Sequence, residues 1–157
     1  MLHWKTILVP TDFSDGSRAA LHTAAELAVM CDAHLVLLHV AELPPVLDAG
    51  TMIRPEGTGM AMSLQDFTRD QALGWMSADC EAAGVAPTVK VRHVVEIGPA
   101  VSTVLDVAAR EKADLLVLGT HGRTGFAKLM LGSVTERLVR EARVPVLTVR
   151  HDPKAAK

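Results

Sequence analysis

Short apolar segments alternate five times with segments of helical periodicity, and this alternation constrains the fold more than any other feature of the sequence. Residues 34–40 and 114–119 are almost continuously apolar. Such strands are typical of a parallel sheet that helices cover on both faces. Repeated β–α units with right-handed crossovers therefore predict an α/β fold, a single-domain, doubly wound, Rossmann-like sandwich with a five-stranded parallel sheet in the order 3-2-1-4-5.

The element boundaries follow from the apolar runs and from the residues that start and stop helices. Ser14 or Asp15 can cap the first helix, Gly84 can end the second, and Pro99 suits the first helical position of the third. The expected strands are 6–10, 34–40, 88–95, 114–119 and 145–150, and the expected helices are 16–31, 63–83, one that opens at 98–99, and 132–142. Residues 1–150 form the predicted domain, and 151–157 form a short tail.

Residues 42–62 interrupt this rhythm with three prolines and three glycines. A connection of this length is uncommon in a compact domain, so we predict a long flexible loop. Two interpretations stay open. The segment is a disordered variable insertion, or Met52, Met60 and Met62 fold over a ligand.

Composition narrows the function classes. Of 157 residues 49% are hydrophobic and 22% charged, the formal net charge is −2, and no apolar run reaches the length of a membrane span. We therefore expect no nucleic-acid partner and no membrane insertion. Because no signal peptide pattern precedes the first strand, and because Cys31 and Cys80 have no metal-ligand spacing and are expected to be apolar helix residues, we expect a cytoplasmic protein.

The strongest functional signal follows the fourth predicted strand. Glycines stand at 119, 122, 125 and 132, and the last of them opens a helix. Glycine lets backbone amides approach an anion, and a helix N-terminus adds unpaired N–H groups and a positive dipole end. Ligands of open α/β sheets lie beyond the carboxyl ends of the strands, where the strand order reverses, so this turn is expected to face Pro10, Thr11 and Asp12.

These residues on their own leave a second interpretation open, in which the glycines only shape a loop. Ser133 and Glu136 fit a capping box, which needs no ligand. Arg123 and Lys128 either add positive charge near phosphates or lie in solvent.

The spacing Gly-x-x-Gly-x9-Gly-Ser at Gly119, Gly122, Gly132 and Ser133 resembles the nucleotide-binding signature of ATP-binding universal stress proteins. The segments KTILVPTDFS at 5–14, GPA at 98–100 and 113–150 are similar to the opening strand, the third helix start and the C-terminal block of that family. The resemblance covers nearly the whole chain. It implies an adenine nucleotide alpha-hydrolase-like fold and a site for ATP.

The resemblance also implies roles for single residues. Asp12 is expected on the nucleoside, since a carboxylate only accepts hydrogen bonds and would repel phosphates; its alternative is an Asx-turn after the first strand. His121 either contacts phosphate or ribose or hydrogen-bonds within its loop. The full expected set is Pro10, Thr11 and Asp12 at the adenosine, Val40 near the adenine, Gly119, His121, Gly122, Gly132 and Ser133 at the phosphates and ribose, and Val134 and Thr135 at the helix start.

The implied function is that of a nucleotide-dependent regulatory or stress-response protein with weak or no turnover. ATP is the expected ligand, with AMP or ADP as alternatives, and Mg²⁺ would be held through the phosphates. The alternative is a slow ATP hydrolase or adenylyl-transferring enzyme of the same fold class. No Gly-Lys-Ser/Thr and no Gly-x-Gly-x-x-Gly after the first strand occur, which argues against a P-loop enzyme and a dinucleotide-dependent dehydrogenase.

A third function class is an interaction module with a vestigial site. The segment Val144–Arg150 is expected at a sheet edge, and an apolar edge strand can pair with another chain. The resemblance implies a homodimer through this strand. The alternative is an edge that Pro145 and Arg150 protect. Arg137, Arg140 and Arg143 on the fourth helix alternate with glutamates and are expected to form a solvated face.

Overall fold

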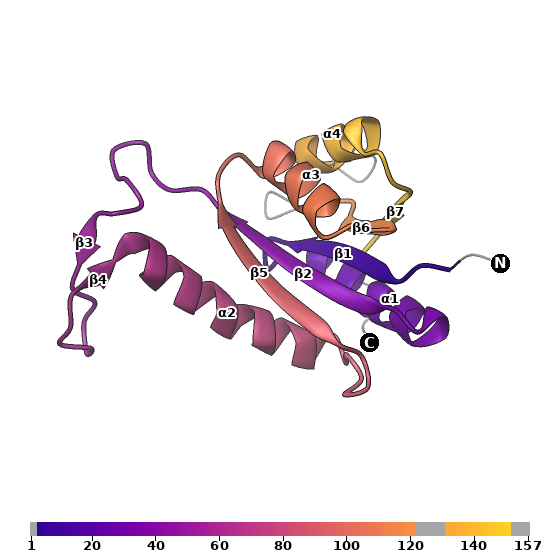
Figure 1. The fold of residues 1–157 in the computed structure, drawn as a ribbon, viewed down its shortest axis with the longest axis horizontal. Coiled ribbons are helices and arrows are strands. Elements are labelled where there is room, and N and C mark those ends of the chain that lie inside the picture. The colour runs from indigo at the N-terminus through magenta and orange to yellow at the C-terminus, as the bar shows by residue number, and fades with distance from the viewer. Residues whose placement is uncertain (1–2, 122–130, 152–157) are drawn as a thin grey trace.

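A computed structural model of the protein describes residues 3–121 and 131–151. Five parallel strands form one sheet in the order β5-β2-β1-β6-β7 (Figure 1). This order is the predicted 3-2-1-4-5, and the doubly wound α/β fold is confirmed. The strands are β1 Thr6–Thr11, β2 His34–Ala41, β5 Val91–Ile97, β6 Leu115–Gly119 and β7 Val146–Val149.

Among the described residues, four helices cover the sheet, two on each face (Figure 1). The helices α1 (Asp15–Cys31) and α2 (Leu64–Ala82) lie on one face. The shorter helices α3 (Ala100–Arg110) and α4 (Ser133–Glu141) lie on the other. The connections between parallel strands therefore place the carboxyl ends of β1 and β6 side by side, at the point where the chain order reverses.

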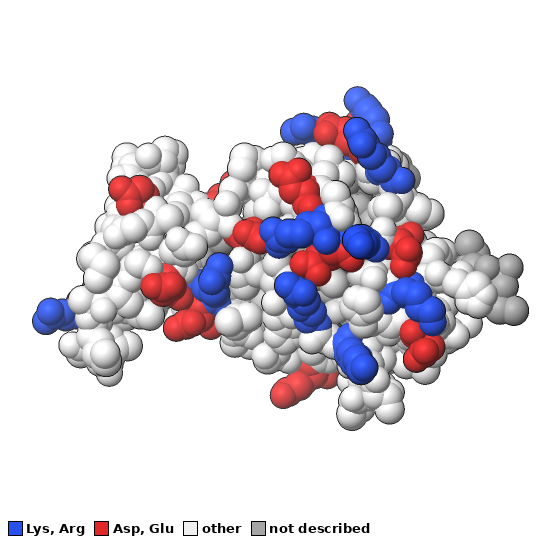
Figure 2. Space-filling model, viewed as in Figure 1, with Lys and Arg blue, Asp and Glu red and all other residues white. Residues whose placement is uncertain are grey.

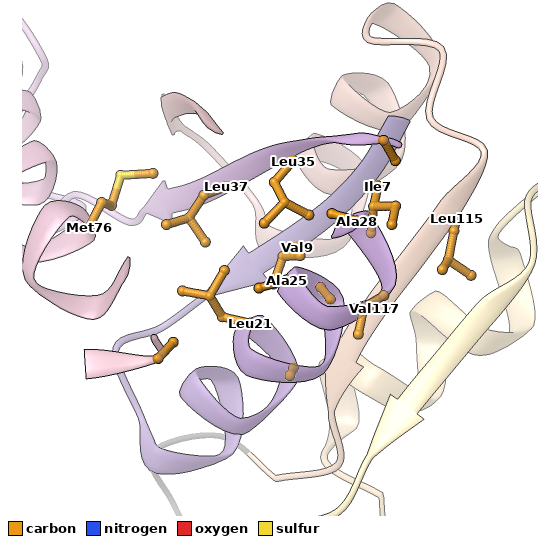
Figure 3. Packing of buried hydrophobic residues seen from close by; sticks show 14 of the residues in the cluster. Ile7, Val9, Leu21, Ala25, Ala28, Leu35, Leu37, Met76, Leu115 and Val117 are labelled. Atoms are coloured by element: carbon orange, nitrogen blue, oxygen red, sulfur yellow. The ribbon is translucent and has the colours of Figure 1, made fainter. Parts of the chain in front are cut away.

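Alternation along the buried strands divides the core into two layers. In β1, Ile7 and Val9 pack beneath α1 and α2, whereas Leu8 packs beneath α3 and α4, and all three are fully buried. Figure 3 shows the first layer, where Leu21 of α1 and Met76 of α2 meet the sheet. Burial of each such side chain contributes about 1.5–3 kcal/mol, so both layers stabilise the sheet that carries the site.

The sequence left Ser14 and Asp15 as the two candidates for the N-cap of helix α1. Ser14 is the cap, and its Oγ accepts a hydrogen bond from the Ser17 amide at 3.2 Å. The buried face of α1 is rich in alanine, which lets the helix lie close to the sheet: Ala20, Ala24, Ala25 and Ala28.

The segment between β2 and α2 contains regular structure that the sequence did not predict. Strands β3 (Met52–Ile53) and β4 (Met62–Ser63) form a short antiparallel pair in the region predicted as a loop, and β4 ends one residue beyond it. Ser63 then caps α2 through the Asp66 amide at 3.0 Å. Figure 1 shows this pair beyond the N-terminal end of α2, at the far end of the molecule from α4. The flexibility of the segment stays a prediction.

Several predicted boundaries were wrong by one to three residues, and three of them have a visible cause. The third strand lies at 91–97 and not at 88–95, because its register is set by pairing with β2, while the Val89 amide closes a turn on the Ala86 carbonyl. Asp114 precedes β6, and its carboxylate accepts from the amides of Lys5 and Thr6. Pro99 is the N-cap of α3, so the helix starts one residue later than predicted.

The surface carries charges of both signs. On the face in Figure 2, lysines and arginines are interspersed with acidic residues. The predicted solvated face of α4 is confirmed for Arg137 and Arg140, which are exposed and pair with Glu141 at 3.2 Å and with Glu136 at 2.8 Å. Arg143 is exposed too, but it lies beyond the end of the helix and not on it as predicted. Within residues 3–121 and 131–151, no helix is long and apolar enough to cross a membrane.

Candidate functional site

A cavity of about 280 Å³ opens at the carboxyl ends of β1 and β6. It lies on the α3/α4 face of the sheet, where Leu38, Val40 and Leu118 form an apolar floor. Ten of the eleven predicted site residues line it together: Pro10, Thr11, Asp12, Val40, Gly119, His121, Gly132, Ser133, Val134 and Thr135. The eleventh, Gly122, lies outside the described residues, as do Arg123, Gly125 and Lys128.

The turn after β1 brings Asp12 to the cavity. Asp12 Oδ1 accepts a hydrogen bond from the Ser14 amide at 3.0 Å, which is the Asx-turn that the sequence left open as an alternative. The next residue, Phe13, has a φ of 63°, a conformation that side-chain-bearing residues rarely adopt. The Asx-turn and the cavity position of Asp12 are thus compatible, since the turn orients the carboxyl group that lines the cavity.

Thr11 contributes to the cavity wall, but its hydroxyl is occupied elsewhere. Thr11 Oγ1 accepts from the Phe13 amide at 3.0 Å and donates to Asp79 Oδ2 at 3.4 Å, and it lies 3.1 Å from Ser17 Oγ. His39 Nδ1 lies 2.9 Å from the Thr11 carbonyl oxygen and donates to it in the tautomer that carries the proton on Nδ1. Thr11 is 6% exposed, so it serves the cavity as a fixed backbone support.

The opposite wall is formed by the end of β6 and the start of α4. Thr135 Oγ1 donates to the Gly119 carbonyl at 2.9 Å, and the Gly132 amide donates to the Thr120 carbonyl at 2.9 Å. These two bonds tie the N-terminus of α4 to the end of the strand. His121 Nδ1 lies 3.0 Å from Thr120 Oγ1, so a hydrogen bond within the loop is present while the residue also lines the cavity.

The capping-box interpretation of Ser133 and Glu136 was wrong. Gly132 is the N-cap and Ser133 is the first helical residue, which puts the hydroxyl one position too late to cap the helix. Glu136 pairs with Arg140. The amides of Ser133, Val134 and Thr135 occupy the first turn, where no preceding helical carbonyl is available to them, and all three residues line the cavity.

Gly16, which was not among the predicted site residues, lets the two walls of the cavity meet. A Cβ on Gly16, in the first turn of α1, would collide with the backbone carbonyl oxygen of His121. A Cβ on Gly119 would lie 2.7 Å from the Gly16 carbonyl oxygen. The N-terminus of α1 and the end of β6 therefore touch through bare backbone, and this contact depends on both glycines.

Other lining residues were also missed because they look like ordinary core residues. They are Ser17, Leu38, Ala100, Val104, Leu118 and Leu138. Ala100 stands in the segment GPA, whose resemblance to the family could have marked it as a site residue, but nothing in the sequence distinguishes the leucines and Val104 from core residues.

The three methionines of the long loop, in contrast, do not line the cavity: Met52, Met60 and Met62 are absent from its lining, and Met52 and Met60 are 64% and 74% exposed. The described structure gives no support for their folding over a ligand there.

Both cysteines lie in helices, as predicted: Cys31 ends α1 and Cys80 lies in α2. Both are free thiols in the structure. Burial, and to a smaller degree the neighbouring Asp79 carboxylate, raises the pKa of Cys80. Burial lowers the pKa of His93, whose Nε2 lies 3.7 Å from the Cys80 sulfur. In the described part of the chain, no three His, Cys, Asp or Glu side chains gather in a way that could hold a metal ion.

The fold and the cavity together define the class: a doubly wound α/β protein with a cleft at its topological switch point. The chain belongs to the universal stress protein family, whose model matches residues 3–150. Among curated relatives, universal stress protein MJ0531 of Methanocaldococcus jannaschii is 32% identical over 96% of this chain and 85% of its own length. Universal stress protein Rv1636 of Mycobacterium tuberculosis is 35% identical over 95% of this chain and 98% of its own.

Solved structures with the same fold include two with bound nucleotides. The structure of MJ0577 matches with a TM-score of 0.74 at 24% identity and covers 96% of this chain and 99% of that one. A universal stress protein in complex with cAMP matches with a TM-score of 0.66 at 24% identity, over 95% and 98%. One from Archaeoglobus fulgidus in complex with dAMP matches with a TM-score of 0.61 at 18% identity, over 94% and 98%. At these identities the likeness establishes the fold.

Proposed function

We propose that this chain binds an adenine nucleotide, with ATP as the first candidate, in the cavity at the switch point, and that it acts as a nucleotide-dependent regulatory protein. The observation that carries the proposal is the chemistry of the cavity wall. One part is apolar, with Leu38, Val40 and Leu118, and another presents the first-turn amides of α4. An apolar floor suits a base, and helix N-terminal amides suit phosphates.

Each predicted residue then has a place in the proposed complex. The adenine lies near Val40, and Asp12 accepts from the adenine amine or the ribose hydroxyls. Gly119, His121, Gly132 and Ser133 meet the phosphates and ribose, together with Gly122, whose assignment rests on the sequence motif. Mg²⁺ is held through the phosphates, as this ion commonly keeps few protein ligands. The relatives solved with cAMP and dAMP support an adenine nucleotide in this fold.

The proposal includes a homodimer through the β7 edge in the cytoplasm. The strand β7 lies at the end of the sheet, and one of its edges has no neighbouring strand among the described residues. Val146, Leu147 and Val149 are only half-buried. An edge of this kind is suited to pairing with a second copy.

Calorimetric titration with ATP, ADP and AMP in Mg²⁺ buffer tests the proposal, with ADP followed during a long incubation. We expect saturable ATP binding without steady ADP release. Steady release would favour the slow hydrolase, and no binding of any adenine nucleotide would refute the proposal.

Asp12→Asn sharpens the test because it keeps the oxygen that accepts from the Ser14 amide. The NH2 group that this substitution introduces is a hydrogen-bond donor. It therefore repels the adenine amine, from which the carboxylate would accept a hydrogen bond. Loss of a hydrogen bond to a charged group corresponds to roughly a tenfold to hundredfold weaker affinity for ATP. Affinity for tripolyphosphate should stay within about twofold; equal losses for both ligands would mean that Asp12 does not contact the nucleoside.

A further inference from the structure

We propose that one face of α2, carrying Trp75 and Asp79, positions the Thr11–Phe13 turn and thereby sets the selectivity of the cavity for the nucleoside part of its ligand. This inference rests on the proposed function. Trp75 and Asp79 are four residues apart, so they share one face of the helix. Neither residue lines the cavity, so both would act through the turn.

Trp75 holds the turn from its outer side through an aromatic cluster. The Phe13 ring lies 4.5 Å from the His39 ring and 5.3 Å from the Trp75 ring, the latter edge to face at 74°. Edge-to-face packing is a favourable aromatic geometry. The contacts fix a side chain whose backbone has a φ of 63°, a conformation that persists only where surrounding contacts determine it.

Asp79 holds the same turn from its inner side. Its side chain is buried, and Oδ2 accepts from Thr11 Oγ1 at 3.4 Å. Its other oxygen, Oδ1, accepts from Arg18 Nε at 3.1 Å and Nη2 at 3.0 Å. Arg18 lies in the first turns of α1 and also pairs with Asp15 at 2.9 Å. Asp79 thus joins the end of β1, the start of α1 and the C-terminal half of α2.

The two anchors flank the residue that would read the ligand. Thr11 precedes Asp12 and is tied to Asp79, and Phe13 follows Asp12 and is tied to Trp75. With both neighbours fixed, the direction in which the Asp12 carboxyl group leaves the backbone is fixed as well. A carboxylate placed about 1 Å away from its partner loses most of a hydrogen bond, so loosening either anchor should weaken the nucleoside contact and leave the phosphate contacts at α4 unchanged.

The test compares Trp75→Leu and Asp79→Asn with Asp70→Asn. Asp70 is exposed on the same helix and lies outside the cavity lining, so it is the matched control for the loss of one carboxylate. The asparagine of Asp79→Asn could still accept from Thr11, so this variant mainly removes the charge that holds Arg18. We expect each test variant to weaken ATP binding about three- to tenfold, with tripolyphosphate affinity within about twofold of wild type and Asp70→Asn unchanged for both ligands.

A double-mutant cycle separates positioning from general loosening of the fold. In an Asp12→Asn background, Trp75→Leu should cost less than about twofold in ATP affinity, because the group that it positions is already disabled. Full additivity, or equal losses for ATP and tripolyphosphate, would overturn the inference while the proposed function stands.

Backbone amide NMR of the ligand-free protein gives an answer that does not depend on nucleotide. The amide signals of Asp12, Phe13 and Ser14 should shift or broaden in Trp75→Leu and Asp79→Asn, and those of Ser133–Thr135 should not. Unchanged signals at the turn would overturn the inference even if wild-type protein binds no adenine nucleotide and the proposed function has failed.

Discussion

The two faces of the sheet differ in the length of the helices that pack on them. On one face, α1 and α2 have 17 and 19 residues, and on the other, α3 and α4 have 11 and 9. At about 1.5 Å per residue, the helices of the longer pair exceed those of the shorter pair by about 12 Å on average. The short helices begin at the carboxyl ends of the strands, where Ala100 of α3 and the first turn of α4 line the cavity.

The faces also differ in the contacts at this end of the sheet. On the α1/α2 side, the buried Thr11 hydroxyl bonds to both Ser17 and Asp79, and Asp79 also accepts from Arg18. On the α3/α4 side, the floor is apolar and the first turn of α4 faces the space. The two faces thus have different roles. The α1/α2 face (the closed face) determines the geometry of the loops, and the α3/α4 face (the open face) provides the volume for a ligand.

Leu37 and Leu38, which are adjacent in β2, test the difference between the two faces with one and the same substitution. Leu37 packs under α1 and α2, Leu38 lines the cavity, and both are 0% exposed. Leu37→Ala should destabilise the protein by about 4 kcal/mol and Leu38→Ala by about 2–3 kcal/mol, because a side chain beside an existing cavity has fewer packing contacts to lose. Urea unfolding measures both values. Equal costs would mean that the two faces are packed alike, and a change in ATP affinity is expected for Leu38→Ala alone.

Gly16 tests the place where the two faces meet. A Cβ there would lie against the His121 backbone, so a methyl group must push α1 away from the end of β6. Overpacking of this kind costs about 1–3 kcal/mol. At about 2–4 °C per kcal/mol for a protein of this size, Gly16→Ala should lower Tm by about 2–12 °C in calorimetry.

Gly74→Ala is the matched control for this substitution. Gly74 lies within α2, and a Cβ there would meet nothing within 4 Å among the described residues. Its replacement should stabilise the protein by about 0.5–1 kcal/mol, since alanine is the better helix former. A Gly16→Ala protein as stable as wild type would show that the contact between α1 and β6 adapts without cost.

The sequence predicted the order of elements and most of the cavity lining for a physical reason. Buried parallel strands need continuous apolar runs, and the segments that follow β1 and β6 must meet wherever the strand order reverses. Pro10–Asp12 and Gly119–Ser133 could therefore be assigned to one place before any coordinates were known, and the described part of both segments contributes to one cavity.

The supporting residues could not be predicted in the same way. Asp79 is 68 residues from Thr11 and 61 from Arg18, and its contacts depend on the angle at which α2 crosses the sheet. Nothing in the periodicity of α2 distinguishes Asp79 from a solvated aspartate. The capping box failed for a smaller reason, because the helix starts one residue earlier than a cap at Ser133 requires, and a shift of one residue is within the ordinary uncertainty of a helix boundary.

His93, on the α1/α2 side of the sheet, gives the test with the smallest expected effect. The direction of its pKa shift determines the sign of that effect. His93 lies in β5 opposite Leu37, with its ring beside Cys80, and burial lowers its pKa from 6.5. The unfolded chain therefore binds more protons at this histidine than the folded chain does. The neutral imidazole makes its full contribution to the free energy of unfolding above pH 6.5, and this contribution is lost as the pH falls towards the lowered pKa.

Replacing His93 should therefore flatten the pH profile of stability. As the pH falls below 6.5, wild-type protein should lose free energy of unfolding more steeply than His93→Gln, measured by urea unfolding at half-unit pH intervals. His3→Gln, an exposed position, controls for the loss of an imidazole elsewhere. If His93→Gln and wild type give parallel profiles, the closed face admits enough water to solvate the charged ring, and the contrast between a tightly covered and an open face would be weaker than the structure indicates.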